Sequence, residues 1–107
     1  MLGAAYRGGV KETAFSGVFA TVEALQDRGA QVAVHDPMYT DDELAALGFT
    51  PFHLGDKADA VVVQADHAVY REIGAEDVPG IRTLVDGRRV TDPSAWPGVI
   101  RRVIGAP

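Results

Sequence analysis

Residues 60–65, Ala60-Val61-Val62-Val63-Gln64-Ala65, decide the fold. The run is apolar nearly throughout, and the polar pair Asp66-His67 ends it. Strands that are apolar on both faces are typical of parallel sheets covered on both sides, because antiparallel strands with one wet face alternate instead. The segment therefore predicts a buried strand in a parallel sheet.

Shorter segments of strand character lie on both sides of this run. Pro51 places one of them at a sheet edge, because proline cannot donate to a strand ladder. The first segment reads only as the tail of a strand, so we expect it to be short or completed by a neighbouring copy. The expected strands besides 60–65 are Leu2–Ala5, Gln31–His35, Phe49–Leu54, Ile81–Val85 and Val99–Ile104.

Helix signals fall between these strands. Val18, Val22 and Leu25 form an apolar stripe with helical spacing, and Gly29 follows as a stop signal. The three expected helices run from a cap at Ser16 to Arg28, from the capping box of Thr40 and Glu43 to Gly48, and from a cap at Asp66 to Ile73. Alternating strands and helices predict an α/β fold, a Rossmann-like three-layer α/β/α sandwich with a mostly parallel sheet, in one domain over residues 1–107.

Composition excludes several kinds of function. The 107 residues contain no cysteine, which removes disulfides, thiolate metal sites and a cysteine nucleophile. A net charge of -5 disfavours nucleic acid as a partner. The sequence has neither a signal peptide nor an apolar run of about 20 residues, so we expect no membrane contact and a cytoplasmic protein. His35, His53 and His67 are scattered, and no metal site is expected.

Ligands of open parallel sheets bind beyond the carboxyl ends of the strands. Arg7 and Arg88 both follow such ends, and the planar guanidinium fork suits a phosphate or carboxylate. The alternative that these arginines only pair with surplus acids stays open. The four expected ends are Tyr6-Arg7-Gly8-Gly9, His35-Asp36-Pro37, Asp66-His67 and Asp86-Gly87-Arg88-Arg89.

The first loop does not fit a dinucleotide fingerprint. Aligned on G-x-G-x-x-G it gives Gly3, Ala5 and Gly8, so the middle glycine that lets backbone approach a pyrophosphate is absent. Asp36 lies 28 residues after Gly8, whereas a ribose-binding acid is expected after about 20. We interpret Asp36 as a turn former before proline.

Four motifs in order resemble the UDP-glucose/GDP-mannose dehydrogenase family, in its C-terminal UDP-binding domain. The stretch Leu2-Gly3-Ala4-Ala5-Tyr6-Arg7 is similar to the family's L-G-x-A-[FY]-K. The other three motifs are Arg28-Gly29-Ala30-Gln31-Val32 with His35-Asp36-Pro37, Ala58-Asp59-Ala60-Val61-Val62-Val63 with Asp66-His67, and Val85-Asp86-Gly87-Arg88. The resemblance covers essentially the whole chain.

The resemblance implies that Tyr6, Arg7 and Arg88 contact a UDP-sugar, with Lys11 and Asp86 as secondary candidates. Arg7 stands where the family usually has lysine, and Ala14 where it has an arginine that reaches the cofactor, which is typical of the UDP-N-acetylmannosamine branch. The family binds NAD in a separate N-terminal domain and carries its catalytic cysteine ahead of this one. The resemblance thus implies a homo-oligomeric oxidoreductase of which this chain, inactive by itself, is the substrate-binding part.

A stand-alone regulatory or protein-binding module is the alternative. A phosphoryl receiver needs paired acids after its first strand to hold a metal, and this chain has Tyr6-Arg7 there. The absence of paired acids disfavours a receiver, but the alternative of a small protein-binding domain stays open.

Overall fold

Parallel strands form the middle of the structure, a computed structural model that describes residues 1–14 and 16–105. β1 (Ala33–Val34) pairs with β2 (Thr50–Pro51), and β3 (Ala60–Val63) pairs with β4 (Thr83–Asp86), which pairs with β5 (Ile100–Val103). All three pairings are parallel. The predicted buried strand is β3.

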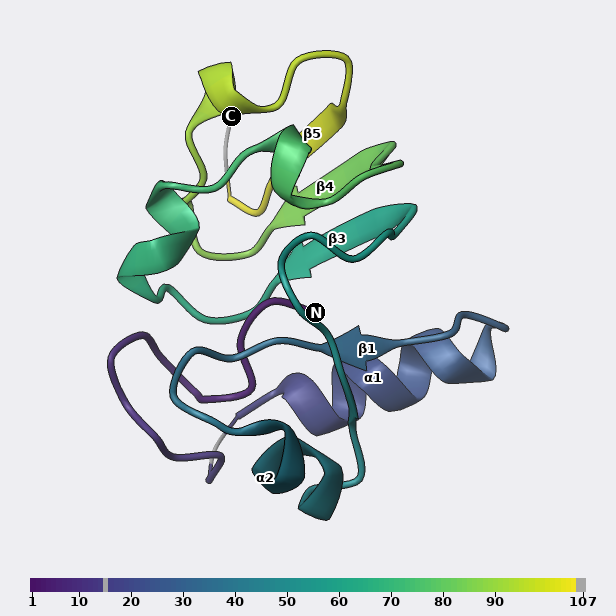
Figure 1. Cartoon of the computed structure of the whole chain (residues 1–107), viewed down its shortest axis with the longest axis vertical. Coiled ribbons are helices and arrows are strands. Elements are labelled where there is room, and N and C mark those ends of the chain that lie inside the picture. The colour runs from purple at the N-terminus through teal and green to yellow at the C-terminus, as the bar shows by residue number, and fades with distance from the viewer. Residues whose placement is uncertain (15, 106–107) are drawn as a thin grey trace.

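Leu2 joins the two groups of strands into one sheet. It forms parallel bridges to His35 on one side and to Val63 on the other. Its N–H donates to the Val62 carbonyl at 2.8 Å, and its carbonyl accepts from Gln64 at 2.8 Å. The spatial order is therefore β2, β1, Leu2, β3, β4, β5, with the N-terminus between β1 and β3 (Figure 1). The prediction of a short first strand is confirmed.

The first two helices form where their local signals predict them. α1 (Val18–Asp27) has Gly17 at its N-cap, so the predicted cap, Ser16, lies one residue too early, although its hydroxyl accepts from the Val18 N–H at 3.2 Å. Gly29 follows the last turn with a φ of +90°, which glycine adopts without steric cost. α2 (Asp41–Ala46) has the complete capping box of Thr40 and Glu43.

The prediction of a helix from Asp66 to Ile73 is wrong. Only a 3₁₀ turn, η1 (Ala68–Arg71), forms there, and two further 3₁₀ turns follow, η2 (Ala75–Asp77) and η3 (Pro93–Ala95). The Asp66 carboxylate does not cap η1, because it accepts a hydrogen bond from the Gly8 N–H instead. A distant backbone donor replaces the local cap, and the segment lacks the cap that we expected to start a longer helix.

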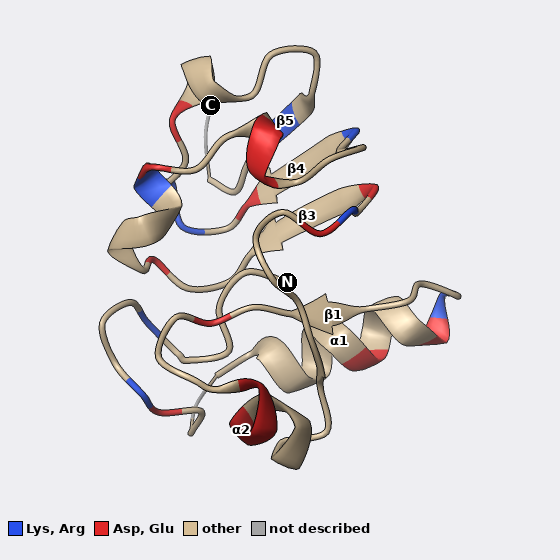
Figure 2. Ribbon diagram, in the orientation of Figure 1, with Lys and Arg blue, Asp and Glu red and all other residues tan. Residues whose placement is uncertain are grey.

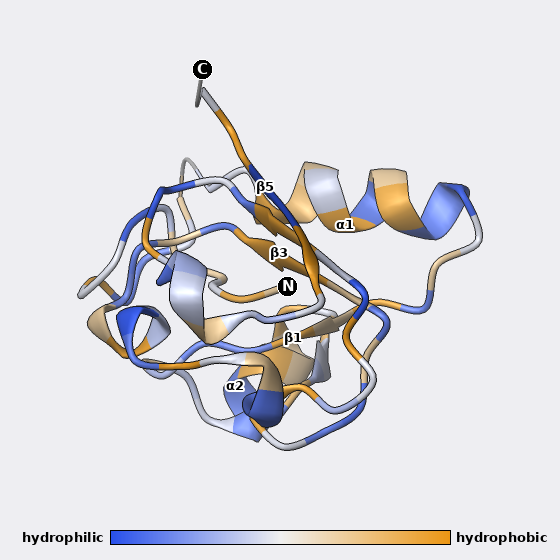
Figure 3. Cartoon of the chain, turned by 90° about the horizontal axis from the view of Figure 1, so that it is seen from above, coloured by the Kyte–Doolittle hydropathy of each residue, from blue (hydrophilic) through white to orange (hydrophobic). Residues whose placement is uncertain are grey.

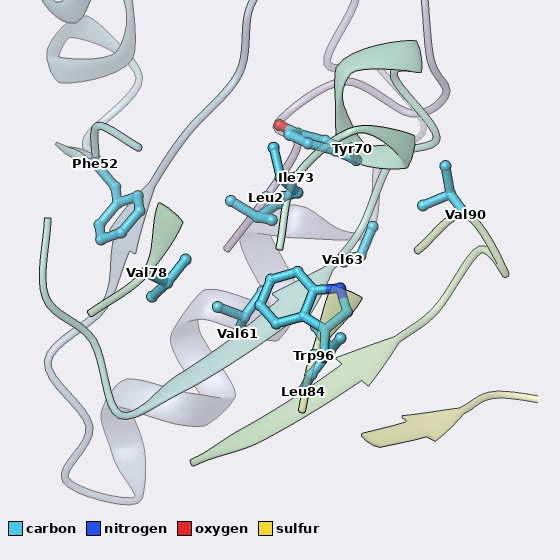
Figure 4. Close-up of a cluster of buried hydrophobic side chains, with 10 residues drawn as sticks. All are labelled: Leu2, Phe52, Val61, Val63, Tyr70, Ile73, Val78, Leu84, Val90 and Trp96. Atoms are coloured by element: carbon cyan, nitrogen blue, oxygen red, sulfur yellow. The ribbon is translucent and has the colours of Figure 1, made fainter. Parts of the chain in front are cut away.

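Two apolar clusters cover the two faces of the sheet. α1 and α2 pack on β1 through one cluster, Ala4, Val18, Val22, Val34, Leu44 and Phe49. The 3₁₀ turns lie over the other cluster, in which Trp96 and Tyr70 cover β3 and β4 (Figure 4). In Figure 3, α1 lies on one side of β3 and β5. The predicted fold class, α/β and Rossmann-like with a parallel sheet, is confirmed.

The helices are short. Over the described residues, none is both long and apolar enough to cross a bilayer.

Candidate functional site

The carboxyl ends of the strands bring three predicted site residues together. Arg88 follows β4, and its Nη1 donates to the Tyr6 carbonyl oxygen at 3.2 Å. The Arg7 guanidinium lies 5.6 Å from the centre of the Tyr6 ring. Figure 2 shows the basic residues of the first loop and of the turn after β4 on the same side of the molecule, toward which the strands point. Tyr6, Arg7 and Arg88 thus share one edge.

The loop that carries Tyr6 and Arg7 is fixed by the turn after β3. The Gly8 N–H donates to Asp66 Oδ1 at 2.5 Å, and the Gly9 N–H donates to His67 Nδ1 at 3.1 Å. Gly8 lies so close to this turn that an added Cβ would stand 2.2 Å from the Asp66 carbonyl oxygen. Only glycine allows this approach, so the sequence of both segments sets the position of the loop.

Asp36 fixes the start of the same loop. Its Oδ2 accepts from the backbone N–H groups of Ala4 and Ala5 and from His67 Nε2, the last at 2.9 Å. Since Nδ1 of His67 accepts from the Gly9 N–H, Nε2 is the ring nitrogen that donates to Asp36. The other oxygen of Asp36 accepts from Met38, as a turn former does. Asp36 is both the predicted turn former and a buried anchor of the first loop.

Asp86 holds the turn that presents Arg88. Its carboxylate is fully buried. One oxygen accepts from the Arg88 N–H at 2.9 Å, and the other from the N–H groups of Val90 and Thr91 and from the Thr91 hydroxyl. Burial favours the neutral acid, but the hydrogen bonds from Thr91 and its neighbours outweigh it and lower the pKa of Asp86. The Asp86 carboxylate thus accepts hydrogen bonds from its own chain and positions Arg88.

Arg88 also faces an acid across the edge. Its Nη2 lies 3.5 Å from Asp66 Oδ1. The Gly8 N–H, and less strongly the Arg88 guanidinium, lower the pKa of Asp66, so this carboxylate is charged at neutral pH. Arg88 is about one third exposed, which leaves part of its guanidinium fork open to a ligand.

Lys11 makes contacts away from this group. Its ammonium pairs with Glu43 of α2 and lies 5.4 Å from the centre of the Tyr39 ring. The side chain ties the far part of the first loop to α2.

The histidines have protein partners. His35 Nδ1 lies 2.8 Å from the Tyr70 hydroxyl, and burial lowers the pKa of this ring. The exposed His53 lies 2.8 Å from Asp41. The described residues contain no group of three His, Asp or Glu side chains arranged to hold a metal ion.

The first loop does not fit NAD. Asp36, the candidate for a ribose, has both oxygens committed to the chain and is 3% exposed. The N–H groups of Ala4 and Ala5, which a pyrophosphate would need, point at this carboxylate. α1 starts only at Val18, so its N-terminus does not follow the strand directly.

Sequence reasoning missed Asp66 and His67 as anchors of the first loop. The only available signal was their place directly after the central strand, where side chains reach the ligand edge. Their partners, Gly8 and Gly9, are each 58 residues away in the chain.

The fold and this edge define a Rossmann-like α/β domain with a candidate anion site at the carboxyl ends of its strands. The UDP-glucose/GDP-mannose dehydrogenase family, UDP binding domain, matches residues 1–93. The chain belongs to this family.

Individual relatives agree with the family. The chain is 27% identical over 104 residues to the UDP-N-acetyl-D-mannosamine dehydrogenase of Methanococcus maripaludis, covering 90% of this chain and 23% of that protein. It resembles the UDP-D-ManNAc dehydrogenase structure from Pyrococcus horikoshii with a TM-score of 0.70 at 24% identity, over 97% of this chain and 24% of that one. It also resembles the UDP-N-acetyl-mannosamine dehydrogenase structure from Staphylococcus aureus. The TM-score is 0.74 at 19% identity, over 95% of this chain and 24% of that one. The two structures show a shared fold, and the chain spans about a quarter of each relative.

Proposed function

We propose that the carboxyl edge of the sheet binds the uridine diphosphate part of a UDP-sugar. The observation that carries this proposal is the convergence of Tyr6, Arg7 and Arg88 at that edge, with Arg88 bonded to the Tyr6 carbonyl. A domain with a net charge of -5 repels a diphosphate unless positive charge gathers locally. Membership of the family supports UDP as the nucleotide.

Each residue has a role that follows from its environment. The Arg88 guanidinium meets the diphosphate, because its turn is held by Asp86 and its fork is partly exposed. Arg7, stacked over Tyr6, adds a second positive charge from the first loop. Tyr6 packs beside the nucleotide. Asp66 keeps the two arginine-bearing segments close through Gly8 and Arg88, and Lys11 shapes the loop from α2.

In its relatives this domain is about a quarter of a longer protein, and the proposal extends to such a whole protein. That protein would be a homo-oligomeric, cytoplasmic UDP-sugar 6-dehydrogenase that oxidises a C6 hydroxyl to a carboxylate and so makes uronic acids for polysaccharides. UDP-N-acetylmannosamine is the substrate favoured by the relatives. NAD, which the N-terminal domain would bind, accepts the hydride. The part of this chain is to hold the nucleotide while the reaction occurs elsewhere.

A UDP titration of the isotope-labelled chain, followed by amide NMR shifts, tests the binding role. We expect shifts at Gly8, Gly9 and Arg88 with a dissociation constant on the order of 0.1–1 mM. The binding is weak because this domain covers only one side of the ligand and leaves the other side exposed to solvent. Uridine, which lacks the phosphates, should bind much more weakly. With NAD and UDP-sugars, the chain alone should produce no NADH absorbance. The absence of shifts at several millimolar UDP would overturn the binding role.

A further inference from the structure

A carboxylate stands at the same edge as the arginines of the proposed site. Asp66 follows β3, and 38% of its side chain is exposed. The hydrogen bond from the Gly8 N–H, and less strongly the Arg88 guanidinium, lower its pKa, so the side chain is an anion at neutral pH. A fixed negative charge weakens the binding of a diphosphate. Affinity for the diphosphate therefore does not explain this charge.

Support of the first loop does not explain the charge either. Asp66 Oδ1 accepts from the Gly8 N–H at 2.5 Å, and the side-chain carbonyl of an asparagine could accept the same hydrogen bond without a charge. The ion pair with Arg88, at 3.5 Å between two partly exposed side chains, contributes little to stability. The loop needs an acceptor at position 66, but it does not need an anion.

The carboxylate and the proposed ligand share one guanidinium. Arg88 Nη1 donates to the Tyr6 carbonyl oxygen at 3.2 Å, and Nη2 lies 3.5 Å from Asp66 Oδ1. A phosphate that meets the exposed part of this guanidinium must therefore lie beside the carboxylate. Asp66 Oδ2 accepts no hydrogen bond from any other described residue, so no second donor among them offsets the negative charge. The charge of Asp66 is thus free to act on the phosphates of a ligand.

Two ligands with the same nucleotide differ in charge at this point. In a UDP-sugar each phosphate is linked on two sides and carries a single negative charge. Free UDP ends in a phosphate monoester, whose second pKa is about 6, so it carries about one more negative charge at pH 7.5. Arg7 and Arg88 attract this extra charge, and Asp66 repels it.

We propose that Asp66 makes the carboxyl edge select a sugar ester of UDP against free UDP. The inference rests on the proposed function, because it names the selectivity of the same site. A specific site discriminates by repelling the wrong ligand as well as by attracting the right one. At about 6–8 Å and near a protein surface, one unit charge changes an affinity about fivefold. The same side chain supports the first loop through its oxygen and selects the ligand through its charge.

Asp66→Asn separates the charge from the support of the loop. UDP and its β-methyl ester, in which a methyl group esterifies the terminal phosphate, are titrated into the labelled chain at pH 7.5. The ester lacks the extra charge and adds no sugar hydroxyls. In Asp66→Asn, UDP should gain more affinity than the ester, so that the ratio of their dissociation constants, UDP over ester, falls about fivefold relative to wild type. Hydrogen exchange at Gly8 should stay unchanged, because the asparagine oxygen still accepts from its N–H.

Asp59→Asn is the matched control, because it removes an exposed carboxylate directly before β3, at the other end of the same strand. It should change the ratio by less than about twofold. Three results would overturn the proposal. They are an unchanged ratio in Asp66→Asn, an equal fall in both variants, and a parallel loss of both ligands with faster exchange at Gly8, which would leave Asp66 a support of the loop only.

The same titrations separate this selectivity from the proposed function. If wild type binds neither ligand, the proposed function fails and the selectivity fails with it. If wild type binds both ligands and the ratio is the same in Asp66→Asn, the selectivity alone is refuted.

Discussion

The two edges of this sheet are held in different ways. At the carboxyl edge, the buried carboxylates of Asp36 and Asp86 and the half-exposed Asp66 bind backbone N–H groups of the loops. At the amino edge, backbone hydrogen bonds join the segments: the Arg82 N–H donates to the Asp59 carbonyl at 2.8 Å, and the Ala58 N–H donates to the Pro79 carbonyl at 3.2 Å. These side-chain hydrogen bonds fix the loops of the first edge, and fixed loops suit a preorganised binding site. The second edge is held by backbone pairing between neighbouring segments.

The strongest test of the carboxyl edge is Asp86→Ala. The change leaves the N–H groups of Val90 and Thr91 and the Thr91 hydroxyl without their buried acceptor. We expect a loss of about 3 kcal/mol in the free energy of unfolding, measured by urea denaturation. Asp27→Ala removes an exposed acid at the end of α1 and should change stability by less than about 0.5 kcal/mol. Equal effects would contradict a special role for the buried carboxylate.

A smaller loss is expected for Gly8→Ala. The new methyl group would stand 2.2 Å from the Asp66 carbonyl oxygen, so the first loop must move away from the turn after β3. This should cost about 2 kcal/mol and weaken UDP binding. Gly17→Ala is the control, since its nearest neighbour is the end of the Gln64 side chain at 3.1 Å. Equal stability of the two variants would show that the first loop does not approach the turn after β3 this closely.

His67→Ala should act through the same loop. It removes the acceptor of the Gly9 N–H and one donor to Asp36, for a loss of about 1–2 kcal/mol. Hydrogen exchange at Gly9 should become faster. His53→Ala, at an exposed ring, should leave that exchange unchanged. Unaltered exchange at Gly9 in His67→Ala would show that the ring does not hold the loop.

Sequence signals predicted the elements whose causes are local. The apolar run of β3, the capping box of Thr40 and Glu43, and Gly29 after α1 act within a few residues. The edge on which Tyr6, Arg7 and Arg88 meet also followed from the rule for parallel sheets.

Long-range partners were the part that the sequence did not reveal. Asp66 has the sequence signature of a helix cap, but a donor 58 residues away takes its carboxylate. Asp86 is a different case, because its partners Val90 and Thr91 lie only four and five residues away, but the turn that folds them back on the carboxylate has no clear signal in the sequence. A side chain that chooses between a local and a distant partner cannot be assigned from spacing alone.

The most direct test of the central claim is the UDP affinity of two arginine variants. Arg88→Ala removes the guanidinium at the carboxyl edge, whereas Arg102→Ala removes an exposed one on β5, and both change the net charge equally. Titrations of UDP followed by NMR, with circular dichroism as the folding control, give the dissociation constants. We predict that Arg88→Ala weakens UDP binding about tenfold, or about 1.4 kcal/mol, and that Arg102→Ala changes it less than about twofold. Equal affinities of wild type and Arg88→Ala, or equal losses in both variants, would contradict a UDP site at the carboxyl edge.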